Sequence, residues 1–109
     1  MASGSAVSLR IDHKRIEYLP GAIEAARRMF FSGGLKNNRD FLQGSVKFAP
    51  RVSEEFRALL FDPQTSGGLL ISLPAESADK ALQELRRRDV SARVIGEVLT
   101  RQPSLIEIV

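Results

Sequence analysis

Segments with the two-residue period of β-strands alternate along this chain with segments of helical period, and this alternation restricts the fold more than any other feature. Val7–Asp12 alternates apolar and polar side chains, as a half-buried strand does. Patterns typical of strands recur at Ser45–Ala49, Arg93–Leu99 and Leu105–Val109. The alternation predicts an α+β fold in which helices pack on a sheet.

One further strand is predicted from an unbroken apolar run. The five residues Leu69–Leu73 read LLISL, with a β-branched residue at the centre. A run of this length in which four of the five residues are large and apolar is typical of a strand that is covered on both faces. We therefore expect it to be the central strand of a mixed sheet of four or five strands.

Three helices are predicted between these strands. The first begins at Pro20, a residue suited to the first helical position, and ends at Gly33 and Gly34. A polar loop is expected at Leu35–Gly44. The second helix begins after an N-cap at Ser53 and ends before Pro63. The third, Glu76–Arg88, has the clearest helical period, carried by Ala78, Ala81, Leu82 and Leu85.

Length and composition exclude several classes of protein. With 109 residues the chain forms one domain, and without cysteine it has no disulfides, thiolate metal sites or cysteine nucleophile. His13 is the single histidine, and because Lys14 and Arg15 follow it we expect it to be exposed. No apolar stretch is long enough to cross a membrane and no signal peptide is recognisable, so we expect a cytoplasmic protein without a membrane partner.

The basic excess does not indicate nucleic-acid binding. The net charge is +3, with one tyrosine and no tryptophan to stack on bases. The run Arg86–Arg88 is interpreted as a solvated helix end, where cations complement the helix dipole.

The least ordinary local sequence is DPQTSGGLL, residues 62–70. Two glycines and two hydroxyl side chains join a helix to the predicted central strand. Glycines allow the backbone to approach a ligand closely, and successive amides in such a turn can bind an anion, although a tight connection also needs small residues. No lysine follows the glycines, so this is not a Walker A loop.

The string continues as DPQTSGGLLISLP and is followed by a predicted helix and by the segment VIGEV at residues 94–98. This sequence resembles the selenophosphate synthetase family, also called selenide, water dikinase. That family belongs to the aminoimidazole ribonucleotide synthetase-like superfamily. Supporting matches are LPGA at residues 19–22, the Gly33–Gly34 pair, Asn38 with Arg39, and VKF at residues 46–48. Leu35 departs from the family, which often has threonine there.

The resemblance implies that residues 1–109 are a nearly complete C-terminal domain of a two-domain enzyme, related to the ferredoxin-like arrangement. The enzyme would make selenophosphate from selenide, ATP and water, releasing AMP and phosphate. Its reactive cysteine or selenocysteine and most of its magnesium and nucleotide ligands belong to an N-terminal catalytic domain, which is absent here. We therefore expect ATP and Mg²⁺ in the parent enzyme, none in this truncated form, and no activity from it alone.

The partners implied are that N-terminal domain and, in the parent enzyme, a second copy in a homodimer. The residues carried over as candidate ligand contacts are Asp62, Thr65, Ser66, Gly67, Gly68, Asn38 and Arg39, none of them catalytic and none a metal ligand. Arg39 is equally interpretable as a solvated or inter-domain residue, and Asp62 as a turn former. The alternatives for the whole chain are a stand-alone binding or regulatory module and the equivalent domain of a sister ATP-dependent synthetase.

Overall fold

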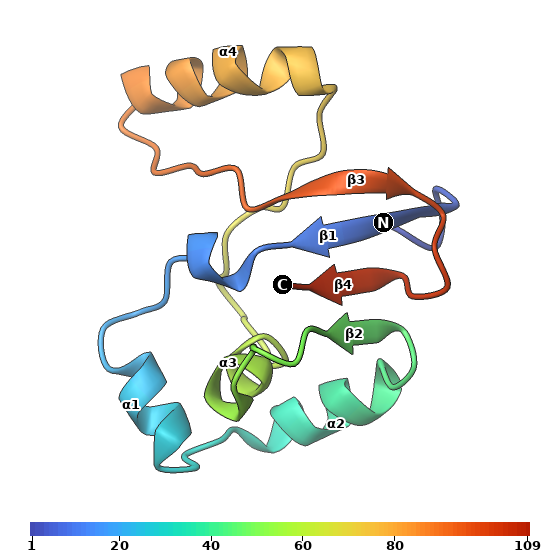
Figure 1. Ribbon diagram of the computed structural model, residues 1–109. Coiled ribbons are helices and arrows are strands. Elements are labelled where there is room, and N and C mark those ends of the chain that lie inside the picture. The colour runs from blue at the N-terminus through green and yellow to red at the C-terminus, as the bar shows by residue number, and fades with distance from the viewer.

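The computed structural model describes residues 1–109 and contains one four-stranded mixed sheet with four α-helices (Figure 1). The strands are β1 (Val7–Ile11), β2 (Val46–Phe48), β3 (Gly96–Thr100) and β4 (Ile106–Ile108). Their order across the sheet is β2-β4-β1-β3. β1 and β2 both run parallel to β4, and β3 runs antiparallel to β1. The predicted α+β class with a mixed sheet is confirmed.

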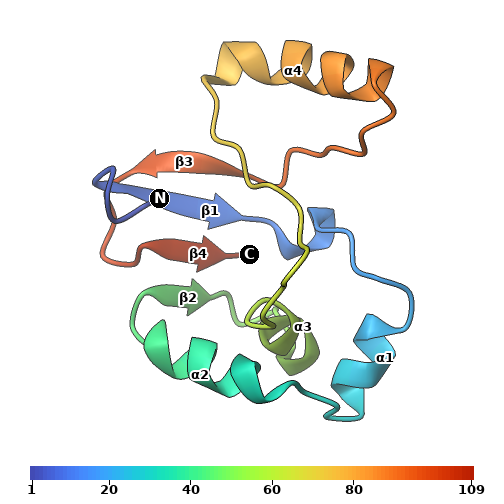
Figure 2. The same ribbon diagram turned by 180° about the vertical axis from the view of Figure 1, so that it is seen from behind.

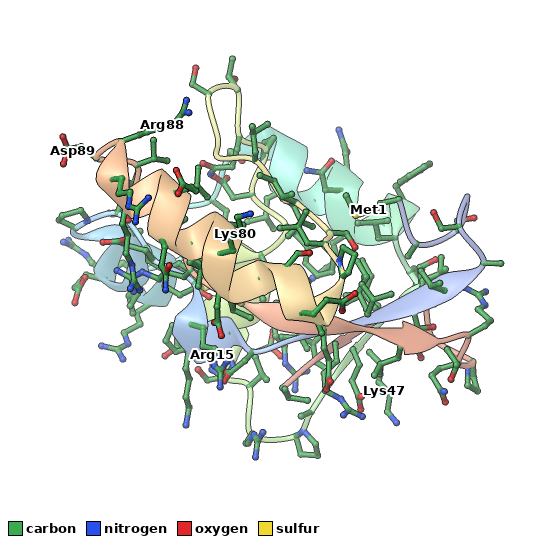
Figure 3. All side chains as sticks on the ribbon, turned by 90° about the horizontal axis from the view of Figure 1, so that it is seen from above. Met1, Arg15, Lys47, Lys80, Arg88 and Asp89 are labelled. Atoms are coloured by element: carbon green, nitrogen blue, oxygen red, sulfur yellow. The ribbon has the colours of Figure 1, made fainter.

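The helices are α1 (Ala22–Arg27), α2 (Gly33–Phe41), α3 (Glu54–Leu59) and α4 (Ala75–Arg87), with a 3₁₀ turn, η1, at His13–Arg15. None of them is long and apolar enough to cross a bilayer. α1, α2 and α3 lie together at the β2 side of the sheet, whereas α4 stands beyond β3 (Figures 1 and 2). Viewed from above, Lys47 of β2 points to the side of the sheet opposite α2 (Figure 3).

The hydrophobic core lies under the β2 half of the sheet. Its buried members are Leu35 of α2, Ala58 of α3 and Phe61, and Phe48 of β2 packs against them. The rings of Phe48 and Phe61 meet edge to face with centroids 5.6 Å apart. This core fixes α2 and α3 on the sheet because each contributes a side chain to it.

The predicted loop at Leu35–Gly44 is wrong, because most of it belongs to α2. The Gly33–Gly34 pair begins this helix and does not end the one before it. α1 is shorter than predicted and is followed by Met29, whose φ of 59° is left-handed. Two glycines and two asparagines make α2 a poor helix by propensity. Its stability comes instead from burial of Leu35 in the core.

The predicted central strand at Leu69–Leu73 is also wrong. These residues form no strand and are exposed, Leu69 to 90%. The central strands are β1 and β4, each of which pairs on both sides. The hydrophobic run indicated burial, but the positions beside β1 and β4 are taken by other strands.

The expected exposure of His13 is wrong as well. Its side chain is buried, and Nδ1 donates to the carbonyl oxygen of Val109 over 2.6 Å. The imidazole packs on Phe56 with ring centroids 5.0 Å apart. The two neighbouring cations suggested a surface position, but the ends of β1 and β4 lie side by side and cover this one residue. The position of the arginine run is confirmed, since Arg86–Arg88 end α4 and are exposed.

Candidate functional site

The turn that begins at Asp62 leaves α3 and carries the chain toward α4. It crosses the sheet on the side where α3 lies (Figure 2). Asp62 is half-buried, and Thr65, Ser66, Gly67 and Gly68 are exposed. The turn is therefore held at its beginning and open along the rest of its length.

Two side-chain hydrogen bonds fix the carboxylate of Asp62. The Ser32 hydroxyl donates to Oδ1 over 2.8 Å, and the Gln64 amide donates to Oδ2 over 2.9 Å. Ser32 precedes α2 and lies 30 residues before Asp62 in the chain. Both oxygens of Asp62 are thus engaged within the chain, and the residue works here as the anchor of the turn.

The first turn of α2 packs directly on Pro63. A Cβ added at Gly34 would lie 2.8 Å from Cγ of Pro63, so the helix approaches the proline as closely as a glycine permits. At Gly33, one residue earlier, the same atom would meet nothing within 4 Å. Gly34 is therefore required for close contact with the turn, and Gly33 is not.

Asn38 and Arg39 of α2 surround Phe61, the residue before Asp62. The Asn38 side-chain amide donates to the carbonyl oxygen of Phe61 over 2.9 Å. The guanidinium of Arg39 lies 5.9 Å from the Phe61 ring centroid, and it forms an ion pair with Glu54 over 3.3 Å. The structure therefore brings Asn38, Arg39 and Asp62 together as the support of one turn.

The outer part of the turn is less constrained. A Cβ at Gly67 would lie 3.0 Å from Cβ of Gln64, and one at Gly68 would meet nothing within 4 Å. Neither glycine has the positive φ that excludes other residues. Between the two, Gly67 is the more restricted position, because the strand that was expected to adjoin Gly68 is not formed.

An apolar hollow of about 190 Å³ opens beside this anchor. Its wall comes from α1, α2 and α3 and from the residues between α1 and α2, and includes Phe30, Phe31 and Leu35. Asp62 is its one polar residue. The hollow can accept a small apolar group, but it offers no cation or backbone donor set for a phosphate.

The charged side chains nearest the hollow form ion pairs with one another. Glu55 of α3 accepts from Arg27 of α1 over 3.3 Å. Hydrogen bonds from its own backbone N–H and from the Ser53 hydroxyl, together with Arg27, hold the pKa of the Glu55 carboxyl below its usual value. These contacts join α1 to α3.

The opposite face of the sheet carries a row of alternating charges. Arg10 of β1 contacts Glu107 of β4 over 3.1 Å and Glu97 of β3 over 3.2 Å. Lys47 of β2 stands next to Glu107 in the strand register. The hydrogen bond and charge of Glu107, with Glu97, raise the pKa of the Arg10 guanidinium above its usual value. Opposite charges on neighbouring strands therefore pair with one another, as expected of a solvated face of a sheet.

The residues present do not by themselves fit magnesium or a nucleotide. The structure contains no group of three or more His, Cys, Asp or Glu side chains that could hold a metal ion. The polar groups of Asp62, Asn38 and Arg39 are engaged by partners in this chain. Only the hydroxyls of Thr65 and Ser66 project from an exposed and otherwise unengaged part of the turn, and their role toward a ligand stays a prediction.

Sequence reasoning missed the partners that hold the turn. Ser32, Gln64 and Glu54 were not singled out, and Gly34 was interpreted as the end of a helix. A serine directly before a helix is a recognisable N-cap signal, and Ser32 with the two glycines after it carries that signal. Its contact with Asp62 depends on the packing of α2 on α3, which no local pattern contains.

Comparison with known proteins finds relatives that are much longer than this chain. A family model described as AIR synthase related protein, C-terminal domain, matches residues 1–107. A selenide, water dikinase of Pelobacter propionicus is 41% identical over 91% of this chain, and one of Clostridium botulinum (strain Eklund 17B / Type B) is 38% identical over 93%. Selenide, water dikinase 2 of Peptoclostridium acidaminophilum is 36% identical over 100% of the chain. The match covers 29%, 29% and 31% of those three proteins, so the chain spans less than a third of their length.

Proposed function

Because the chain belongs to the family of AIR synthase related proteins, C-terminal domain, and is similar to several selenide, water dikinases, we propose that it works as the C-terminal domain of such a dikinase. The reaction is the ATP-dependent conversion of selenide and water to selenophosphate, AMP and phosphate, and it takes place in the cytoplasm. The observation that carries the proposal is the extent of the match, which runs through 91–100% of the chain in the three relatives named above.

The domain contributes structure to the reaction and not the reacting groups. Its carboxylates, amides and guanidinium groups near the turn are engaged with one another. The chain has no cysteine, so the nucleophile must come from another part of the enzyme. ATP and Mg²⁺ are held mainly by that part, an N-terminal catalytic domain that is the partner of this one. The enzyme is a homodimer.

The turn at residues 62–68 is the part of this domain that faces the cleft between it and the N-terminal catalytic domain. Its beginning is fixed by Ser32, Gln64 and Pro63, and the less constrained outer residues extend from that anchor. The exposed hydroxyls of Thr65 and Ser66 are free to donate to or accept from a ligand or the partner domain. An anchored turn can bring such hydroxyls to a phosphoryl-transfer site, where correct positioning of a contacting residue contributes to the rate.

The proposal is tested by exchanging domains. The matching C-terminal part of the Pelobacter propionicus enzyme is replaced with residues 1–109, and selenide-dependent AMP release from ATP is measured. We expect the hybrid to be active and the isolated chain to be inactive, since phosphoryl transfer needs metal carboxylates that this chain lacks. The matched control is the same hybrid carrying Thr65→Ala and Ser66→Ala.

Two results would contradict the proposal. The first is a folded, ATP-binding hybrid without selenide-dependent activity, which would indicate that the domain belongs to a sister synthetase. The second is AMP release by the isolated chain. If the control hybrid keeps full activity, the domain assignment stands and the ligand role of the two hydroxyls is wrong.

A further inference from the structure

The first turn of α2 contains no acidic residue. Ser32 occupies the N-cap position with extended backbone angles, and its hydroxyl makes no hydrogen bond to the helix that follows. α3 begins after Ser53 in the same backbone conformation, but it carries Glu54 and Glu55 in its first turn. A negative charge at this end of a helix stabilises it, because the charge offsets the helix dipole. α3 therefore has a stabilising charge of its own, and α2 has none.

Asp62 supplies the missing charge from a distant part of the chain. The Ser32 hydroxyl donates to Oδ1 of Asp62 over 2.8 Å, so the side chain at the N-cap of α2 holds this carboxylate at the start of the helix. A hydrogen bond to a carboxylate is stronger than one between neutral groups. The contact joins α2 to a residue 30 positions later and, with it, to the turn at residues 62–68.

Ser32 differs from the α2 residues that also support the turn. Asn38 bonds to a backbone carbonyl oxygen that precedes the turn, and Gly34 only leaves room for the proline ring. Ser32 binds the one carboxylate that the turn contains. It is also exposed, so removing its hydroxyl leaves neither a cavity nor a buried polar group without a partner. Its loss can therefore alter the turn without unfolding the domain.

The path of contacts continues from Asp62 into the outer part of the turn. The side-chain amide of Gln64 donates to Oδ2 over 2.9 Å, so the carboxylate is held at both oxygens. A Cβ at Gly67 would lie 3.0 Å from Cβ of Gln64, which places the Gln64 side chain against the outer turn. Thr65 follows Asp62 by three residues, a span of at most about 11 Å. A displacement of the carboxylate therefore reaches residues 65–67 both along the backbone and through Gln64.

We propose that Ser32 is a positioning residue of the dikinase reaction. It acts through Asp62, and it holds the hydroxyls of Thr65 and Ser66 where they contact a ligand or the catalytic domain. Ser32 itself touches no reacting group. This inference rests on the proposed function and adds to it a residue on which the rate of the reaction depends.

A positioning role has a kinetic signature that a purely structural role lacks. The catalytic domain holds most of the ATP and Mg²⁺ contacts, so loss of the Ser32 hydroxyl should leave KM for ATP unchanged. A misplacement of about 1 Å can lower the rate of an oriented reaction about 100-fold. Gln64 still holds Oδ2 of Asp62 when the hydroxyl is gone, so we expect a smaller loss, about tenfold in kcat.

The test uses the hybrid enzyme in which residues 1–109 replace the C-terminal part of the Pelobacter propionicus dikinase. Ser32→Ala removes the donor, and Ser32→Thr restores a hydroxyl at the same position. The matched control is Ser53→Ala, because Ser53 precedes the neighbouring helix and contacts Glu55 of that helix instead of the turn. Both kcat and KM for ATP are measured from selenide-dependent AMP release. We expect Ser32→Ala to lower kcat about tenfold with KM unchanged, and Ser32→Thr and Ser53→Ala to stay within about twofold of the parent hybrid.

A double-mutant cycle shows whether Ser32 acts through Asp62. In a hybrid that carries Asp62→Ala, Ser32→Ala should have no further effect on kcat, because the group through which it acts is gone. With an active parent hybrid, additive losses, equal kcat for Ser32→Ala and Ser53→Ala, or no restoration by Ser32→Thr would each overturn the inference and leave the proposed function standing. An inactive parent hybrid would contradict the proposed function, and with it any role of Ser32 in that reaction.

A second measurement uses the 109-residue chain alone and does not depend on activity. Backbone ¹⁵N relaxation gives the order parameters of the amides at residues 64–68. We expect Ser32→Ala to lower these order parameters and Ser53→Ala to leave them unchanged. Order parameters that are the same in the two variants would overturn the inference, whatever the activity of the hybrid.

Discussion

The contact between Gly34 and Pro63 allows a quantitative test of how α2 holds the turn. We consider Gly34→Ala, with Gly33→Ala as the matched control in the same turn of the same helix. In a helix interior, alanine in place of glycine adds about 1 kcal/mol of stability. For Gly33 nothing lies within 4 Å of the new Cβ. We therefore expect Gly33→Ala to raise the free energy of unfolding by up to about 1 kcal/mol.

For Gly34 the same gain is opposed by the clash with Pro63. The new Cβ would lie 2.8 Å from the proline Cγ, so either the ring or the helix must move. Overpacking of this kind costs about 1–3 kcal/mol. The net expectation for Gly34→Ala therefore runs from no change to a loss of about 2 kcal/mol, and the two alanine variants should differ by about 1–3 kcal/mol.

The proline identifies the source of that difference. In a background that carries Pro63→Ala the obstructing Cγ is gone, and Gly34→Ala should then stabilise the chain as Gly33→Ala does. Urea unfolding measures all four free energies of this double-mutant cycle. A coupling energy near zero, or a Gly34→Ala variant as stable as Gly33→Ala with Pro63 in place, would refute the contact between α2 and the turn.

Three further outcomes follow from local geometry. Burial raises the pKa of Tyr18, the single tyrosine, so the tyrosinate absorbance of the folded chain should titrate above the ordinary 10.0. The free energy of unfolding should fall as pH rises past that value, because the unfolded state ionises first. A midpoint at or below 10.0 in the folded chain would contradict this. The lowered pKa of Glu55 stabilises the fold above the ordinary value of 4.5, so Glu55→Gln should lower the melting temperature at neutral pH. The difference between the two chains should vanish as pH falls below the folded pKa. A difference that does not depend on pH would show that the carboxylate charge of Glu55 is not its cause. Gly96→Ala should destabilise by about 3 kcal/mol or more, since its Cβ would overlap the Arg10 carbonyl oxygen, whereas Gly68→Ala, which meets nothing within 4 Å, should leave the urea midpoint nearly unchanged.

The elements that the sequence predicted well are those whose pattern is local. β1 alternates apolar and polar residues and is found at Val7–Ile11, and α4 has a clear helical period and is found at Ala75–Arg87. Ser53 directly precedes α3, as its N-cap pattern indicated. In each case the residues that define the element also carry the signal for it.

The elements that were mispredicted depend on distant residues. α2 is helical because Leu35 enters the core and Asn38 bonds to the carbonyl oxygen of Phe61, 23 residues away. His13 is buried because it pairs with Val109, 96 residues away. A window of ten or fifteen residues contains neither partner. The polar composition of the neighbouring residues therefore led to the predictions of a loop at Leu35–Gly44 and of an exposed His13.

The candidate site divides in the same way. The string at residues 62–70 was recognisable because its glycines and hydroxyls are adjacent in sequence, and Asp62 does begin an ordered turn. The residues that position the turn are Ser32, Gly34 and Asn38, and they come from a helix that the sequence did not predict. A motif can therefore be found from sequence while the structure that supports it is not.

The run Leu69–Leu73 shows what a local pattern can and cannot predict. Its pattern indicates residues that are covered, yet Leu69 is 90% exposed. A hydrophobic run reports the free energy of removing side chains from water, about 25 cal/mol per Å², and does not report which element covers them. The positions beside β1 and β4 are occupied by β3 and β2, so the only free positions in the sheet are at its edges. Hydrogen exchange at residues 69–73 tests whether the run pairs there. Fast exchange of these amides agrees with a run that forms no strand, and slow exchange would show that the run adds a fifth strand at an edge of the sheet.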